Sequence, residues 1–96
     1  MKESSSTYRF RLYVTGNAHN SRRAIANLSQ LCDLHLADRH HIEIVDLSRE
    51  PERALSDEVY LTPTLIKLAP GPKAQVIGSL HNMSELLDLL ELERKS

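Results

Sequence analysis

Few residues of this chain have a type and spacing that could carry out covalent chemistry. The single cysteine, Cys32, falls within apolar residues at helical spacing, so we interpret it as a small core side chain rather than as a redox sensor. Ser21 and His19 lie two residues apart, and no acid is placed nearby to orient the histidine as a base. We therefore predict no catalytic residue and interpret Ser21, or its neighbour Asn20, as a helix cap.

Metal and phosphate sites are not predicted either. The histidines lack the spacing of metal ligands on one helix face, and the chain has no pair of cysteines to complete a zinc site. The glycines are isolated and form no phosphate-binding loop. We therefore expect neither a metal nor a cofactor. The residues considered are His19, His35, His40, His41 and His81, with Gly16, Gly71 and Gly78.

Length and charge narrow the remaining classes. The 96 residues suffice for one small domain, which we place at residues 7–94 behind a disordered polar tail at 1–6. A net charge of −1 argues against nucleic acid, and no apolar run reaches the roughly 20 residues of a membrane helix. One cysteine and a polar N-terminus without a signal-peptide pattern favour a cytoplasmic protein.

Hydrophobic periodicity predicts the element order β-α-β-α-β-β-α. We expect the first three strands to be joined by helical crossovers, so that they run parallel, and the fourth to form an antiparallel hairpin with the third. The sheet would then be mixed and four-stranded. The predicted strands are 8–14, a mostly buried 42–47, 64–68 and 75–77, and the predicted helices are 20–36, a two-turn helix near 51–55, and 82–92.

The stretch Leu61-Thr62-Pro63-Thr64 enters the third strand abruptly. Proline cannot donate to a strand ladder and belongs at the first residue of a strand, and an X-Pro bond can be cis. The stretch resembles the Thr-Pro loop of thioredoxin-like folds, where a cis proline faces the first strand's end and the first helix's start. Function is therefore expected where Pro63 meets residues 16–21. Redox enzymes of this shape need a thiolate there, and no cysteine lies in that segment.

Two surface features remain near that loop. Arg22 and Arg23 lie in the first helical turn, and with other cations they suggest either a basic patch that docks an acidic partner or ordinary solvated charges. Three prolines in a short segment suggest rigid turns. The other cations are Arg9, Arg11, Lys67 and Lys73, and the prolines are Pro63, Pro70 and Pro72.

Four motifs in order resemble the KaiB family of circadian clock proteins, over about residues 8–90 and without large gaps. The motifs are Leu12-Tyr13-Val14-Thr15-Gly16-Asn17, Asn20-Ser21-Arg22-Arg23-Ala24, Thr62-Pro63-Thr64-Leu65-Ile66-Lys67 and Val76-Ile77-Gly78.

The resemblance implies a non-enzymatic regulator that binds the hexameric KaiC-type ATPase, with KaiA-like or histidine-kinase proteins as further partners. It also implies fold switching, in which a tetrameric ground state pairs the C-terminal half differently and the monomer is thioredoxin-like. Pro63, Pro70 and Pro72 would take part in that switch. By motif, Arg23 and Lys67 match positions that face KaiC, and the strand edge Ile42, Glu43 and Ile44 matches the edge used for other partners. Arg22 and Lys73 are further predicted partner-binding residues.

Departures from the family pattern indicate a divergent paralogue. Glu58 stands where the family has lysine, Ala74-Gln75 replace an arginine pair, and Gly78-Ser79-Leu80-His81 replace Gly-Asp-Leu-Ser. The alternative is a constitutively thioredoxin-like sensor or adaptor domain, related to a kinase input domain. A capping box at Asn82 and Glu85 favours a long last helix, so we predict that the thioredoxin-like state predominates.

Overall fold

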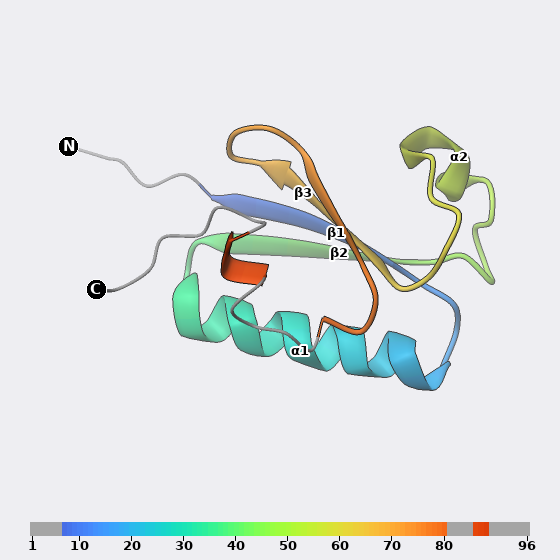
Figure 1. The fold of residues 1–96 in the computed structure, drawn as a ribbon, viewed down its shortest axis with the longest axis horizontal. Coiled ribbons are helices and arrows are strands. Elements are labelled where there is room, and N and C mark those ends of the chain that lie inside the picture. The colour runs from blue at the N-terminus through green and yellow to red at the C-terminus, as the bar shows by residue number, and fades with distance from the viewer. Residues whose placement is uncertain (1–6, 81–85, 89–96) are drawn as a thin grey trace.

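A computed structural model describes residues 7–80 and 86–88 of the chain (Figure 1). The predicted alternation of strands and helices is confirmed as far as the fourth strand, and residues 86–88 are helical. Most of the predicted last helix, its capping box and the tail 1–6 lie outside the described residues. The elements are β1 (Tyr8–Val14), α1 (His19–His35), β2 (His40–Asp46), α2 (Arg53–Asp57), β3 (Thr64–Ala69) and β4 (Ala74–Ile77).

Within the described residues the strands form one four-stranded mixed sheet in the order β2-β1-β3-β4. The predicted hairpin is confirmed, since β3 and β4 pair antiparallel with Thr64 opposite Ile77. β1 and β2 pair parallel, as predicted. The expectation that β3 also runs parallel is wrong, because β3 pairs antiparallel with β1, with Leu12 opposite Leu65.

The path from β2 to β3 stays at one end of the sheet. β2 ends at Asp46, opposite Val14, and β3 begins at Thr64, opposite Tyr13, so the chain enters β3 at the end of the sheet where it left β2. The five residues of α2 span about 7.5 Å, and residues 47–63 do not carry the chain back along the seven residues of β2, about 23 Å. β3 therefore runs the other way.

The main core lies between the sheet and α1, which covers one face (Figure 1). Alternate residues of β1 point to this face, and the apolar stripe of α1 packs on them. Cys32 belongs to that stripe and is fully buried, so its interpretation as a core side chain is confirmed. The buried members are Phe10, Leu12, Val14, Ala24, Leu28, Leu31, Cys32, Leu36, Leu65, Leu80 and Leu86.

The opposite face of the sheet carries a smaller apolar cluster near α2. Tyr13, Val45, Val59 and Ile66 are its buried members, and Ala54 of α2 packs against them. This side of the sheet therefore depends on fewer apolar contacts than the α1 side.

β2 is an edge strand of the described sheet, and the expectation of a mostly buried strand is wrong. Of its seven residues, all of them described, Val45 alone is buried, and Ile44 is about half exposed. Both central and edge strands favour β-branched residues, so this composition could not distinguish the two positions.

Candidate functional site

The segments around Pro63 and the start of α1 come together as predicted. The hydroxyls of Thr15, which follows β1, and of Thr62, which precedes Pro63, lie 2.8 Å apart. The carbonyl of Pro63 accepts a hydrogen bond from the Gly78 N–H at 2.9 Å, and this ties the loop to the end of β4. The Thr62–Pro63 and Ala69–Pro70 bonds are cis.

The start of α1 is not built as predicted. α1 begins at His19, its N-cap is Ala18, and no side chain in the described residues caps it. The buried Ser21 hydroxyl instead accepts a hydrogen bond from the Thr15 N–H at 3.1 Å. Ser21 therefore fastens the first turn of α1 to the end of β1, and the interpretation of Asn20 or Ser21 as a cap is corrected.

Asp46 fixes the loop between β1 and α1 from the neighbouring strand. Its Oδ1 accepts hydrogen bonds from the Gly16 N–H at 2.9 Å and from the Ser48 hydroxyl at 2.7 Å. Hydrogen bonds from Ser48 and Gly16 lower the pKa of Asp46. Gly16 has a φ of +50°, a conformation that glycine adopts readily.

Thiol chemistry has no accessible group in the described residues. Burial, together with the charge of Asp33, raises the pKa of Cys32 to about 12, so the thiol is protonated at neutral pH. Among the described residues no three His, Cys, Asp or Glu side chains are grouped to hold a metal ion.

The six cations of the predicted basic patch do not share one surface. Arg22 and Arg23 are exposed in the first turn of α1. Lys67 is 2% exposed, on the sheet face that packs against α1. Arg11 and Lys73 form ion pairs with acidic residues on the other side of the sheet. The prediction of a single patch is therefore wrong, because Lys67 is buried and the other cations lie on different surfaces.

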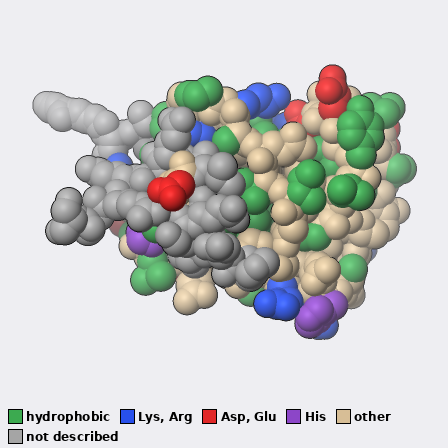
Figure 2. All heavy atoms as spheres, viewed as in Figure 1, with side chains coloured by type: hydrophobic (Ala, Val, Ile, Leu, Met, Phe, Trp, Pro, Cys, Tyr) green, Lys and Arg blue, Asp and Glu red, His purple; other side chains and the backbone are tan. Residues whose placement is uncertain are grey.

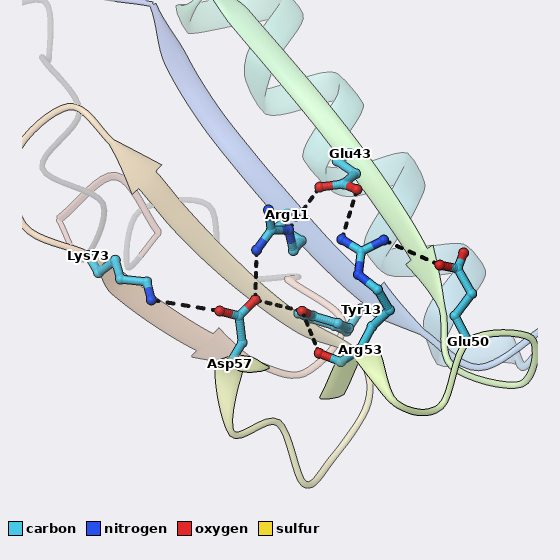
Figure 3. A network of polar contacts seen from close by, with 7 residues as sticks. All are labelled: Arg11, Tyr13, Glu43, Glu50, Arg53, Asp57 and Lys73. Atoms are coloured by element: carbon cyan, nitrogen blue, oxygen red, sulfur yellow. Dashed lines mark hydrogen bonds and ion pairs between the residues drawn. The ribbon is translucent and has the colours of Figure 1, made fainter. Parts of the chain in front are cut away.

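Sequence reasoning missed a polar network on the α2 side of the sheet, shown in Figure 3. Arg11 Nε donates to Glu43 Oε1 at 2.8 Å, and Arg53 Nη2 donates to Glu43 Oε2 at 2.9 Å. The Arg11 hydrogen bond and then the Arg53 hydrogen bond lower the pKa of Glu43. We call Arg11, Tyr13, Glu43, Glu50, Arg53, Asp57 and Lys73 the polar network.

Asp57 is the centre of that network and links α2 to β1. Its Oδ2 accepts hydrogen bonds from Arg11 Nη1 at 2.9 Å and from the Tyr13 hydroxyl at 2.5 Å. Burial would raise the pKa of Asp57, but hydrogen bonds from Tyr13 and Arg11 outweigh burial and lower it. Burial and the bond to Asp57 raise the pKa of Tyr13 to about 12.

The alternation of β1 gave a partial signal for the network. Arg11 was expected on one face of β1, and the parallel register places Glu43 opposite it. Asp57 could not be assigned from sequence, because its contact with Arg11 depends on how the chain folds back after β2.

Large apolar side chains are exposed around α2 and the Pro63 loop. Figure 2 shows hydrophobic side chains gathered on the half of the visible face where α2 and the loop before β3 lie. Leu55, Tyr60, Leu61 and Ile77 are between 57% and 83% exposed. Apolar groups that gather in this way on a surface are typical of interaction sites. Across the described residues, no helix has the length and hydropathy needed to cross a membrane.

The amino-acid sequence is similar to those of named circadian clock proteins. The chain is 42% identical over 77 residues to "Circadian clock protein KaiB3" of Synechocystis sp., covering 80% of this chain and 76% of that protein. It is 35% identical over 86 residues to "Circadian clock oscillator protein KaiB" of Thermosynechococcus vestitus, covering 90% and 80%.

Solved structures show the fold. The N-terminal domain of Synechococcus elongatus SasA superposes with a TM-score of 0.73 at 14% identity, covering 98% of this chain and 92% of that one. Mitochondrial thioredoxin 3 from Saccharomyces cerevisiae gives 0.70 at 17% identity, covering 92% and 81%. The predicted thioredoxin-like fold is thus confirmed.

A family model described as "KaiB domain" matches residues 11–92. This match covers most of the chain, and it agrees with the identities to the named clock proteins and with the resemblance found in the sequence motifs. The chain belongs to the KaiB family.

Proposed function

We propose that this chain is a non-enzymatic cytoplasmic regulator that acts by binding a KaiC-type ATPase ring. The observation that carries the proposal is family membership over residues 11–92, in a thioredoxin-like fold whose one thiol is buried away from the Pro63 loop. A described surface without an accessible thiol can still act by selective docking. The exposed apolar groups around that loop supply the candidate surface.

The docking face extends to both sides of the Pro63 loop. Thr62 contacts Thr15, which Ser21 fastens to the start of α1, so the exposed Arg22 and Arg23 lie on one side. The apolar groups on and after α2 lie on the other. Apolar anchors flanked by arginine are typical of interface cores. We define the docking face as Arg22, Arg23, Leu55, Tyr60, Leu61 and Ile77.

The edge of β2 is the proposed second contact, for KaiA-like or histidine-kinase partners. An extended segment can add to an exposed edge through backbone hydrogen bonds, and Ile44 offers an exposed apolar side chain beside it. Both carboxylate oxygens of Glu43 accept hydrogen bonds from arginines, so we assign Glu43 to support of the strand. Backbone atoms of Ile42–Ile44 would make the contact.

Binding tests the proposal directly. The purified chain is mixed with a KaiC-type ATPase, with and without nucleotide, and the complex is measured by size-exclusion chromatography. We expect Arg22→Glu combined with Arg23→Glu, and separately Leu61→Asp, to weaken the complex at least about tenfold. Arg9→Glu is the matched control, because Arg9 is exposed at the far end of β1 from Thr15. Absence of a complex in both nucleotide states would refute the proposal.

Fold switching remains part of the proposal, with the thioredoxin-like monomer as the binding form and a tetramer as the alternative. The roles of Pro63, Pro70 and Pro72 in it stay predictions. Backbone NMR shifts test which form predominates: strand shifts at residues 65–68 and 75–77 are expected, and helical shifts there would contradict it.

The second candidate is a constitutively thioredoxin-like sensor or adaptor domain. The superposition on the SasA N-terminal domain, over nearly the whole of both chains, supports this reading of the fold. The two candidates differ in whether the chain switches. A second oligomer on a sizing column, or NMR exchange peaks linking two folds, would exclude the second candidate.

A further inference from the structure

α2 is attached to the sheet mainly through polar atoms. None of its apolar residues, all of them described, is buried, whereas the side chain of Asp57 is largely enclosed. Ala54 packs against the smaller apolar cluster, and Val59, just beyond α2, is the nearest buried side chain. Such short elements with few buried groups belong to the least stable part of a fold.

Three polar contacts of α2 converge on one carboxylate, beside the separate link from Arg53 to Glu43 of β2. Asp57, whose side chain is 6% exposed, accepts from Arg11 and Tyr13 of β1 through Oδ2. Its Oδ1 lies 3.7 Å from Lys73 Nζ, on the turn between β3 and β4. The Tyr13 hydroxyl also lies 3.1 Å from the Arg53 carbonyl oxygen. One side chain therefore connects α2 with both a central strand and the hairpin.

Apolar packing does not close the gap between α2 and the hairpin. A cavity of about 170 Å³ lies there, lined by Asp57, Ile66, Lys73, Ala74 and Gln75. Among the described residues, the 3.7 Å ion pair between Asp57 Oδ1 and Lys73 Nζ joins α2 to the hairpin across this cavity. Without the carboxylate, α2 would keep the apolar contacts of Ala54 and Val59 and the contacts of Arg53 with Tyr13 and Glu43. It would lose its links to Arg11 and Lys73 and the hydrogen bond from Tyr13 to Asp57.

The position of α2 determines the shape of the docking face. Leu55 is on α2, and Tyr60 and Leu61 follow it, whereas Ile77 is on β4. These exposed groups form one surface when the segment 53–61 is held against the sheet.

We propose that Asp57 is the positioning residue that assembles the docking face, by holding α2 against β1 and the β3–β4 turn. This inference rests on the proposed function for its consequence in binding. The attachment itself can be measured in the free chain.

Amide hydrogen exchange in the free chain tests the attachment. The Glu58 and Val59 N–H groups donate to Leu55 and Ala54 carbonyls and report on α2. In Asp57→Asn we expect their exchange to rise about tenfold or more, and in Tyr13→Phe, which keeps the ring, by a smaller factor. Glu50→Gln is the matched control. The Glu50 carboxylate accepts a hydrogen bond from Arg53 of α2 at 3.3 Å, and this contact does not join α2 to the sheet. Amides within α1 serve as the reference.

The outcomes separate local attachment from general stability. The proposal would be overturned if Asp57→Asn accelerated exchange of the α1 amides as much as that of Glu58 and Val59. It would also be overturned if Glu58 and Val59 exchanged at the same rate in Asp57→Asn as in Glu50→Gln. Non-additive effects in the combined Tyr13→Phe and Asp57→Asn variant would support it, because both substitutions remove the Tyr13–Asp57 hydrogen bond.

Affinity for a KaiC-type ATPase tests the consequence. Once the carboxylate is gone, fewer contacts hold α2 against the sheet. We therefore expect a form with α2 detached from the sheet to be populated, and the affinity of Asp57→Asn for the ATPase to fall at least about threefold. Glu50→Gln should bind as the wild type does. Faster exchange with unchanged affinity would overturn the role in docking. If the wild-type chain itself binds no ring ATPase, the proposed function fails, and the exchange rates decide the attachment separately.

Discussion

At the scale of single residues, Ser21 performs a structural task at the position where thioredoxin-like enzymes place their chemistry. Its buried hydroxyl accepts the Thr15 N–H and so joins the end of β1 to α1. We expect Ser21→Ala to lower the free energy of unfolding by about 1 kcal/mol, the net value of one hydrogen bond. Urea denaturation measures it, with the exposed Ser29→Ala on the same helix as control. Equal stability of the two variants would contradict the assignment.

Cys32 yields a prediction about reactivity. Because the thiol is buried in the main core and its pKa is raised to about 12, an aromatic disulfide reagent should react with it at pH 8 only when the chain opens. We expect the native reaction to be at least about a thousandfold slower than in urea, in keeping with a marginally stable domain. Rapid modification of the native chain would restore the redox-sensor interpretation.

At the scale of elements, local patterns predicted most of the fold. Alternation located β1, helical spacing located α1, and Pro63 with the Pro70–Pro72 turn located the hairpin. The direction of β3 was missed. Residues 47–63 between β2 and β3 are long enough for a parallel crossover or for a return at the same end of the sheet, so the local pattern did not decide between the two.

The candidate site was predicted less completely, for a physical reason. The proximity of the Pro63 loop to the start of α1 follows from the fold, and the sequence predicted it. The exposure of Lys67 and the contacts of Asp57 depend on strand register and on the path after β2, which no local pattern specifies. Long-range contacts of this kind become assignable only once the topology is known.

The edge position of β2 makes a testable contrast between neighbouring residues. Val45 is buried under the smaller cluster, so Val45→Ala should cost about 2 kcal/mol of unfolding free energy. Ile44 is about half exposed, so Ile44→Thr should cost less than Val45→Ala does, about 1 kcal/mol or below. Chemical denaturation of both variants measures the contrast. A large cost for Ile44→Thr would indicate a covered edge.

At the scale of the whole molecule, the two faces of the sheet are stabilised differently. On the α1 face, the apolar side chains of the main core pack between the sheet and α1. The α2 face combines a small apolar cluster with the polar network. Loss of carboxylate charge therefore acts mainly on the α2 face. The elements of the docking face next to α2 are expected to respond to pH before the α1 face does.

The sign of that response follows from the lowered pKa of Asp57. A carboxyl whose folded pKa lies below its unfolded value of about 3.9 stabilises the fold above that value, and the contribution is lost as the pH falls through the folded pKa. At pH 6 we expect Asp57→Asn to be about 2 kcal/mol less stable than the wild type, as for a hydrogen-bonded charge. The gap should narrow as the pH falls below about 3.9, because the unfolded wild type then takes up a proton, and it should close as the folded carboxyl is protonated as well. Urea denaturation of both chains across this range measures the gap, and a gap independent of pH would show that the charge of Asp57 does not hold α2 in place.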